Sequence, residues 1–318
     1  MRVHLITPAP SRAKGGNWTT AARWAAILRR LGHRVRVSRV YEGGPADLMV
    51  ALHAWRSADS IARFAEMHPS KPLLVALTGT DAYRFIHSDP EPTLRSLELA
   101  DVLIGLHDRI GDILTSSQRA KLRVIYQSAP PGLARRPARR SFRVCVAGHL
   151  REEKDSLRVA LAVRDLPATS RIRVDHYGGA HTPDWADAAR AEMAENPRYH
   201  WHGEVPRSHL RRVFASARLM VLPSRMEGGA NVISEAVMAE LPVIASRIAG
   251  SVGLLGEDYP GYFTVADTDG LRQELLRAES DPMFYRSLEE ACADRRPLFT
   301  VECEEMAWRK LLGQTCGG

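Results

Sequence analysis

The stretch "RVHLITPAPSRAKGGNWTTAARWAAILRRLGHRVRVS", residues 2–38, decides the fold class of this chain. It opens with a short apolar run, passes through a turn rich in proline and glycine, and then shows a helical pattern that ends at Gly32. The residues of that pattern at helical spacing are Trp18, Ala22, Ala25, Ala26 and Leu28. A second apolar run at 34–40 completes a strand–helix–strand unit, which is typical of a parallel sheet.

The same alternation continues along the chain. Short apolar runs predict four further strands, at 47–53, 72–80, 101–107 and 122–128. Residues 129–141, "APPGLARRPARRS", carry three prolines and four arginines without an apolar period, which indicates an interdomain linker. A second alternation follows, with strands predicted at 142–148, 172–179, 218–224 and 241–246 and helices predicted at 156–166, 208–217 and 231–240.

We therefore expect an α/β protein made of two doubly wound Rossmann-like domains that face each other across a cleft. The expected first domain spans 1–130, the linker 131–140 and the second domain 141–300. The tail, 301–318, is expected to form a helix that packs back on the first domain.

Composition places the chain among ordinary globular proteins, with 318 residues, 45% hydrophobic and 25% charged. Its formal net charge is +7, and only five of the 44 basic residues are lysines, the other 39 being arginines. This charge suits an anionic ligand, a nucleic acid or a membrane surface and does not choose among them. No CxxC spacing, signal peptide or membrane-length apolar run occurs, so we expect a reduced, cytoplasmic protein; the cysteines are Cys145, Cys292, Cys303 and Cys316.

The stretch "SRMEGGANVISEA", residues 224–236, follows a predicted strand and enters a predicted helix. It places Glu227 and Glu235 eight positions apart, with Gly228 and Gly229 directly after the first. Helix amino termini attract phosphate through unpaired amides, here those of Ala230, Asn231 and Val232. The pattern predicts a nucleotide-sugar site, and the alternative is a helix cap with a surface charge.

A second candidate is "AGHLREEK", residues 147–154, again at a strand end. His149, Arg151 and Lys154 lie within this one short loop and are suited to bind a diphosphate. The alternative is a solvated charged loop.

These motifs resemble the large retaining glycosyltransferase family of GT-B fold, group four. The resemblance rests on the E-x7-E spacing before "EAVMAELPVIAS", on "GGNW…GHRV", on "VAGHLREEK" and on "ASRIAG". It implies that Glu227 approaches the donor sugar, that Glu235 holds the ribose and that Lys154 grips the diphosphate. His149 stands where the family has an arginine, so phosphate binding is expected to fall to Arg151 or His149.

The resemblance also implies an acceptor side on the first domain. Gly16 and Asn17 are expected beneath the donor phosphates and beside the acceptor, with added positive charge from Arg12 and Lys14. In "LTGTDAYRF", residues 77–85, small hydroxyl residues replace a histidine of the family. Residues expected there to cradle a compact anion are Thr80, Asp81 and Arg84; a helix cap is the alternative for Asp81.

Together the motifs are most similar to the selenosugar synthases of selenoneine biosynthesis. That resemblance implies transfer of a sugar from UDP-N-acetylglucosamine or UDP-glucose to selenophosphate, which yields a 1-selenosugar, UDP and phosphate. Two alternatives stay open: a transferase with a hydroxyl acceptor, small or lipid, and a protein that binds nucleotide sugars without turnover.

Other motifs are set aside. "DTD" at Asp267–Asp269 precedes a predicted helix and is better explained as a cap than as a metal site. "HWH" at 200–202 lacks a third ligand and predicts a pair at a strand edge. The basic run "ARRPARR" has no interleaved aromatic residues, which argues against nucleic acid. We expect no metal, no cofactor and no stable membrane insertion.

Overall fold

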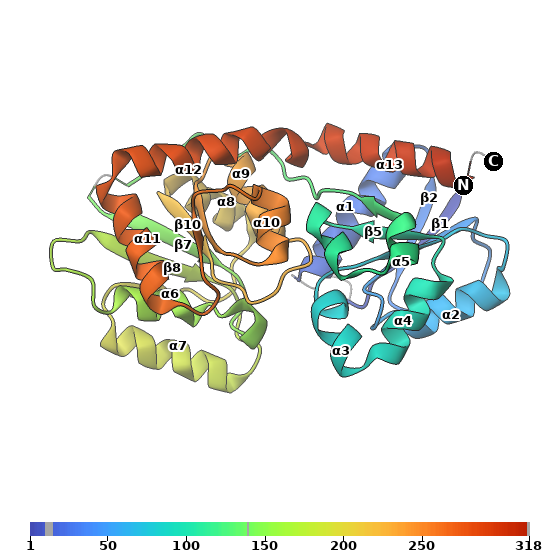
Figure 1. Ribbon diagram of the computed structural model, residues 1–318, viewed down its shortest axis with the longest axis horizontal. Coiled ribbons are helices and arrows are strands. Elements are labelled where there is room, and N and C mark those ends of the chain that lie inside the picture. The colour runs from blue at the N-terminus through green and yellow to red at the C-terminus, as the bar shows by residue number, and fades with distance from the viewer. Residues whose placement is uncertain (10–14, 139, 317–318) are drawn as a thin grey trace. The chain divides into compact units, whose positions relative to one another are not determined.

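The computed structural model describes residues 1–9, 15–138 and 140–316, which form two compact units. The first unit comprises Met1–Gln127, the short segment Glu227–Ala230 and Val301–Gly318. The second comprises Ser128–Met226 and Asn231–Thr300. Each unit is built around a parallel six-stranded sheet covered by helices (Figure 1), so the predicted α/β class is confirmed.

The first sheet has the strand order β2-β1-β3-β4-β5-β6. Its strands are β1 (Arg2–Ile6), β2 (Arg34–Ser38), β3 (Leu48–Leu52), β4 (Leu73–Ala76), β5 (Val102–Gly105) and β6 (Leu122–Val124). The central strands β3 and β4 are buried along their whole length, because helices cover both faces of the sheet. The helices are α1 (Gly16–Arg30), α2 (Ala58–Met67), α3 (Ile86–Ser88), α4 (Pro90–Leu99), α5 (Ser116–Ala120) and α13 (Val301–Cys316), with a π-helix at Asp81–Phe85 and a 3-10 helix at Asp108–Ile113.

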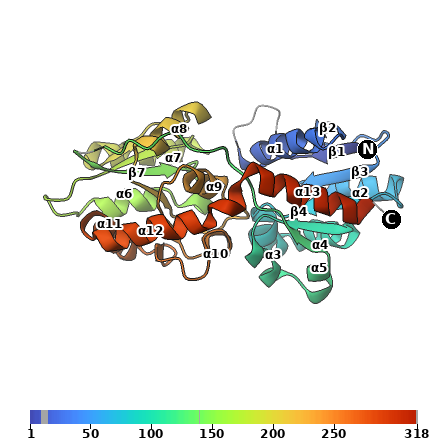
Figure 2. The ribbon, with the colours of Figure 1, turned by 90° about the horizontal axis from the view of Figure 1, so that it is seen from above.

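Helix α1 is where predicted, but only part of its predicted apolar face is buried. Ala25 and Leu28 are buried as predicted, whereas Ala22 and Ala26 are exposed, and the sequence pattern missed the buried Trp24. The large indole decides the face: Trp24 packs edge-on against Trp308 of α13 at 5.0 Å between ring centroids. Its Nε1 also donates to the buried Glu304 carboxylate at 2.7 Å, so α13 (red in Figure 2) is fixed beside α1.

The second sheet has the order β12-β11-β10-β7-β8-β9. Its strands are β7 (Phe142–Ala147), β8 (Ile172–Tyr177), β9 (Tyr199–Trp201), β10 (Leu219–Leu222), β11 (Val243–Ser246) and β12 (Tyr262–Phe263). Its helices are α6 (Leu157–Val163), α7 (Pro183–Glu195), α8 (Arg207–Ser216), α9 (Asn231–Met238), α10 (Ala249–Leu255), α11 (Thr268–Ser280) and α12 (Pro282–Arg295), with 3-10 turns at Glu152–Lys154 and Arg296–Phe299. The order reverses between β7 and β10, and ligands of such sheets bind where the order reverses, beyond the carboxyl ends of the strands.

The predicted linker forms no helix or strand over its described residues, and it is packed along the second unit. Arg136 N donates to the carbonyl of Ala215 in α8 at 2.8 Å, and Gly132 N donates to that of Met238 in α9 at 2.9 Å. A Cβ on Gly132 would lie 2.4 Å from the Cα of Ala239, which explains the glycine in an otherwise bulky segment. This segment is therefore held against the second unit by its backbone.

Candidate functional site

The loop after β7 rests on a buried histidine from β8. Nε2 of His176 donates to the carbonyl of Gly148 at 2.8 Å, and Nδ1 accepts from the hydroxyl of Tyr199 at 2.7 Å. Complete burial lowers the pKa of His176 to about 4, so the ring is neutral and has one donor and one acceptor, each used. Sequence reasoning missed His176, because a lone histidine in a strand carries no spacing signal.

A glycine lets this loop pass close to β8. Gly178 has a φ of +153°, and a Cβ there would lie 2.0 Å from the carbonyl oxygen of Gly148. No other residue fits without moving the loop that carries His149. Gly178 thus fixes the position of the predicted diphosphate loop.

His149 is held as a neutral hydrogen-bond donor. Its Nδ1 accepts from the amide of Gly179 at 3.1 Å, which leaves the hydrogen on Nε2. Burial lowers the pKa of His149; Glu204 opposes this shift, and the charges of Arg151 and Lys154 add to it. His149 can therefore donate one hydrogen bond, but it does not replace the charge of an arginine.

Two cations stand in the same loop. Arg151 precedes the 3-10 turn Glu152–Lys154, and its Nε is buried with no hydrogen-bond partner among the described residues. This Nε lies 3.8 Å from the Glu153 carboxylate. Lys154 is half-buried in the same turn. An arginine whose Nε has no hydrogen-bond partner among the described residues, beside a lysine, is suited to bind an anionic ligand.

The loop after β7 is tied to the loop after β10. Arg225 N donates to the carbonyl of Glu153 at 2.8 Å, and the Arg225 guanidinium lies 3.7 Å from the Asp155 carboxylate. Asp155 adopts a left-handed conformation, with a φ of +42°, and also binds Arg158 at 3.1 Å. The start of the second motif, at Arg225, is thus held beside the first motif within the second unit.

The predicted helix at the second motif is confirmed as α9, which begins at Asn231. Glu235, one turn into it, forms an ion pair with Arg207 at the start of α8. The Glu235 side chain is 21% exposed and that of Arg207 is 62% exposed, so a ligand can compete for the carboxylate. Arg207 was missed by sequence reasoning, and the ribose-binding role of Glu235 stays a prediction.

The segment Glu227–Ala230 belongs to the first unit by its contacts. Glu227 is buried, and a Cβ on Gly228 would lie 2.2 Å from the backbone nitrogen of Gly79. A Cβ on Gly229 would lie 2.5 Å from Cβ of Leu106. Close contacts with Gly79 and Leu106 therefore explain both glycines without a ligand. The donor-binding roles of Gly228, Gly229 and Ala230 stay predictions.

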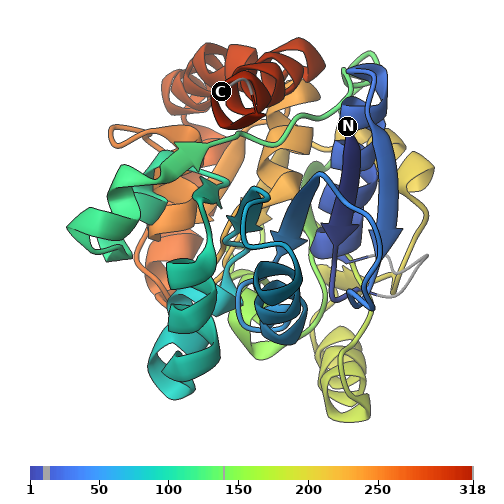
Figure 3. The same ribbon diagram turned by 90° about the vertical axis from the view of Figure 1, so that its right-hand side faces the viewer.

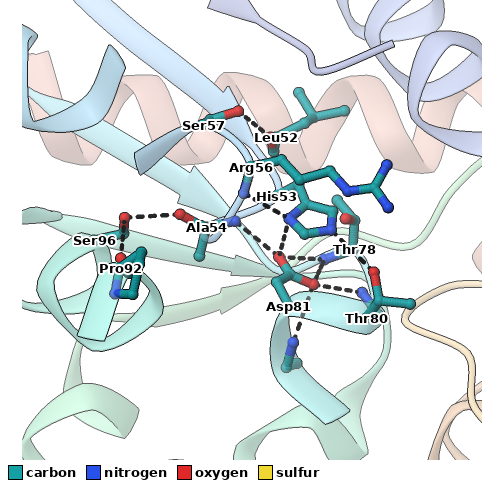
Figure 4. A network of polar contacts seen from close by, with 12 residues as sticks. Leu52, His53, Ala54, Arg56, Ser57, Thr78, Thr80, Asp81, Pro92 and Ser96 are labelled. Carbon is teal, nitrogen blue, oxygen red and sulfur yellow. Dashed lines mark hydrogen bonds and ion pairs between the residues drawn. The ribbon is translucent and has the colours of Figure 1, made fainter. Parts of the chain in front are cut away.

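In the first unit, the Asp81 carboxylate organises the loops after β3 and β4 (Figure 4). It is fully buried and accepts from the backbone amides of Ala54 at 2.9 Å, Thr78 at 3.0 Å, Gly79 at 2.8 Å and Ala82 at 3.1 Å. Its oxygens are thus occupied by backbone donors. Asp81 positions this loop, and the neighbouring Thr80 presents the hydroxyl.

His53, another residue that sequence reasoning missed, lies beside Thr80 (Figure 4). Its Nε2 is 3.0 Å from the Thr80 hydroxyl, and its Nδ1 accepts from the amide of Arg56 at 3.1 Å. His53 has a φ of +72°, which is strained for a residue with a side chain. Burial lowers its pKa, and so a neutral imidazole holds the Thr80 hydroxyl.

The remaining predicted residues of the first unit are placed as follows. Gly16 and Asn17 are the first residues of α1, with Gly15 as its N-cap, so the helix starts two residues earlier than its pattern indicates. Arg84 is exposed, with its guanidinium 5.7 Å from the centre of the Phe85 ring. Arg12 and Lys14 lie outside the described residues.

The motif "DTD" is a helix cap, as predicted. The Asp267 side chain accepts from the amide of Gly270 at 2.9 Å at the start of α11. Within the part of the chain that the structure describes, no helix combines the length and apolarity needed to cross a membrane.

Known proteins resemble this chain in fold and, over one region, in sequence. Residues 141–281 match the family described as "Glycosyl transferases group 1". The HepE protein of Anabaena, solved in complex with UDP and glucose, superposes with a TM-score of 0.79 at 15% identity, covering 99% of this chain and 100% of that one. No curated protein matches the sequence.

Two further structures agree. Sucrose-phosphate synthase from Thermosynechococcus elongatus gives a TM-score of 0.78 at 17% identity, with 98% of each chain covered. A glycosyltransferase from Rickettsia africae gives 0.73 at 12% identity, covering 99% of this chain and 98% of that one. The chain therefore has the GT-B glycosyltransferase fold.

Proposed function

We propose that this protein is a glycosyltransferase that uses a UDP-sugar as donor, bound mainly by the second unit. The observation that carries the proposal is the hydrogen bond from Arg225 to Glu153, which joins the cationic loop after β7 to the loop that leads toward α9. The group 1 match over 141–281 covers both loops, which supports the same assignment. HepE was solved with UDP-glucose, which is a donor of this class.

The chemistry follows from charge. When the bond between the sugar and UDP breaks, negative charge gathers on the departing diphosphate. Arg151 and Lys154 supply positive charge there, and His149 supplies a neutral N–H donor. The amino terminus of α9, at Asn231 and Val232, adds the positive end of the helix dipole. Because these groups are fixed before the reaction, they stabilise the transition state without rearranging.

We further propose selenophosphate as the acceptor, on the strength of the motif resemblance to selenosugar synthases. The selenium attacks the anomeric carbon, and the carbon–oxygen bond to UDP breaks, so that UDP leaves with the bonding electrons. Water then cleaves the selenium–phosphorus bond, which gives a 1-selenosugar and phosphate. Gly16, Asn17, Thr80 and Arg84 are the acceptor residues of this proposal, and Asp81 holds Thr80 in place.

For Glu227 we propose the role that the family resemblance implies, which is to approach the donor sugar. UDP-N-acetylglucosamine and UDP-glucose are the two donors proposed. A hydroxyl acceptor is the second candidate, because the half-buried cations described above serve any acceptor equally well.

The test is a UDP-release assay with each UDP-sugar, run with selenophosphate, with inorganic phosphate, with a simple alcohol or a lipid, and with no acceptor. Release that requires selenophosphate supports the full proposal. Release with a simple alcohol or a lipid but without selenophosphate would retain the transferase and replace its acceptor. UDP binding without release under any acceptor would contradict the enzymatic assignment.

A further inference from the structure

Positive charge gathers on one face of the first two strands. β1 and β2 pair in parallel with Arg2 beside Arg34 and His4 beside Arg36, and these strands run side by side at the edge of the sheet (dark blue in Figure 3). Alternate residues of a strand share a face, so all four side chains lie on the same side of the sheet. Three arginines and a histidine thus form a cluster, which we call the β1–β2 cluster.

Among the described residues, a carboxylate pairs with Arg2 and with neither Arg34 nor Arg36. Asp47 accepts from the backbone amide of Arg2 at 2.8 Å and from its Nη2 at 2.9 Å. The hydrogen bond from the Arg2 side chain lowers the pKa of Asp47 to about 2, so this carboxylate is charged and occupied. Arg34 and Arg36 are exposed and make no side-chain hydrogen bond or ion pair with any described residue.

The histidine of the cluster, His4, is a buried and uncharged side chain. His4 is buried, its Nε2 lies 2.8 Å from the Ser38 hydroxyl, and its ring meets Tyr41 edge-on at 5.0 Å. Burial lowers its pKa, and the charge of Arg36 adds to that effect. The ring is therefore neutral near pH 7 and leaves the local net positive charge unchanged.

The cluster borders a cavity. Its volume is about 250 Å³, and its lining consists of the four cluster residues, Val3, Val35 and the loop of Gly43, Gly44, Pro45 and Ala46. Gly43 and Gly44 both have left-handed backbone angles, with φ of +104° and +111°, which bend the loop around the opening. Ligand pockets commonly measure roughly 300–1,000 Å³, so this one suits a compact ligand.

The cavity is separate from Thr80, a proposed acceptor residue of the same unit, and from His53, which holds the Thr80 hydroxyl. Arg2 and Arg34 begin their strands, so the cavity lies toward the amino ends of the sheet. His53 and Thr80 follow strands β3 and β4, at the opposite, carboxyl edge. Neither His53 nor Thr80 lines the cavity, so a ligand here is not bound by them.

We propose that the β1–β2 cluster binds a small phosphate-bearing anion, such as a diphosphate or a phosphate monoester. Guanidinium groups bind phosphate oxygens in pairs of parallel hydrogen bonds, and Arg34 and Arg36 are both available for this. Their separation along one strand is roughly 7 Å, so a single diphosphate can contact both. The bound anion relieves the repulsion between the neighbouring cations.

The experiment is calorimetric titration of the full chain with inorganic pyrophosphate at fixed ionic strength, in the presence of saturating UDP to block the proposed donor site. The wild type should bind one pyrophosphate, and the double variant Arg34→Gln/Arg36→Gln should bind at least ten times more weakly. Arg95→Gln is the matched control, because Arg95 is an exposed arginine of α4 in the same unit. It should bind like the wild type.

Both substituted arginines of the double variant are exposed, so it is expected to fold, and circular dichroism with thermal unfolding checks this. Equal affinity in the wild type and the double variant, an equal loss in Arg95→Gln, or no binding by the wild type each overturns the proposal. Sedimentation with phosphatidic acid vesicles separates a lipid headgroup from a free anion: capture by vesicles without pyrophosphate binding also overturns it. The comparison of pyrophosphate affinities among the wild type and the variants tests the proposal even if the protein does not bind UDP.

Discussion

The backbone amide of Arg225 donates to the carbonyl of Glu153 at 2.8 Å, across the point where the strand order of the second sheet reverses. This hydrogen bond ties the loops that follow β7 and β10 to each other. The turn that carries Lys154 is thereby held beside Arg225 within the second unit. Asp155 is the residue to test, because its carboxylate forms ion pairs with both Arg225 and Arg158.

Asp155→Ala should destabilise the protein by about 1–2 kcal/mol, because alanine is strained in the left-handed conformation that Asp155 adopts. Asp155→Asn should cost less, since asparagine tolerates that conformation but lacks the charge. Urea unfolding measures both, and UDP affinity should fall in the same order. Equal losses in the two variants would show that conformation is not the deciding factor.

Gly178→Ala should unfold the loop after β7, because the new Cβ would lie 2.0 Å from the Gly148 carbonyl oxygen. We expect a loss of more than about 2 kcal/mol in the free energy of unfolding, and loss of UDP binding. Gly203→Ala is the control: Gly203 has a φ of +67° but nothing within 4 Å of its Cβ position. This variant should lose only about 1 kcal/mol in the free energy of unfolding, because it adds backbone strain but no steric clash.

The stability of the protein should fall as the pH falls from 7 to 4, and His176 is one reason. Its pKa in the folded protein is lowered to about 4 by burial, below the ordinary value of 6.5, so the unfolded chain binds more protons in that interval. The stability contribution is complete above pH 6.5 and is lost as pH falls toward 4, by about 3 kcal/mol in total. Urea unfolding at several pH values measures the slope.

His176→Asn should flatten that slope, whatever it does to the stability at pH 7. His107 also has its pKa lowered to about 4 by burial, so part of the slope should remain. An unchanged slope in His176→Asn would mean that this imidazole takes up protons in the folded protein as it does in the unfolded chain.

The fold was predictable because its signal is local. Strands such as β3 and β4 are continuous apolar runs buried on both faces, and the sequence pattern predicted each of them. Strand β12, with two residues, is too short to produce a period and was missed, and the three-residue β9 was indicated only by the strand edge predicted at "HWH". The paired loops after β7 and β10 were found separately, as motifs at strand ends.

Residues whose partners come from distant segments were not predictable. His53 meets Thr80 across 27 positions, and Arg207 meets Glu235 across 28. Those contacts depend on which strands and helices become neighbours and on a strained backbone angle at His53, and no local pattern encodes either.

Lys154→Ala should lower kcat for sugar transfer about 100-fold, since removing one preorganised group that stabilises developing charge typically costs that much. Lys154→Arg should recover part of the loss, because it restores the charge with different geometry. Lys310→Ala, at an exposed lysine of α13, is the matched control and should leave kcat unchanged. An equal loss from Lys310→Ala would point to net charge and not to the loop.

Glu235 and Arg207 should respond in opposite directions to UDP. Glu235→Ala should weaken UDP binding about tenfold, because a charged hydrogen-bond acceptor for the ribose is lost. Arg207→Ala should bind UDP as well as the wild type or better, since it frees the carboxylate that Arg207 occupies in the structure. Neither variant should change stability much, because this ion pair is largely exposed on the Arg207 side. Titration calorimetry measures both affinities. If Arg207→Ala weakened UDP binding as much as Glu235→Ala, the guanidinium would be a ligand of UDP in its own right, and the carboxylate would serve to hold it.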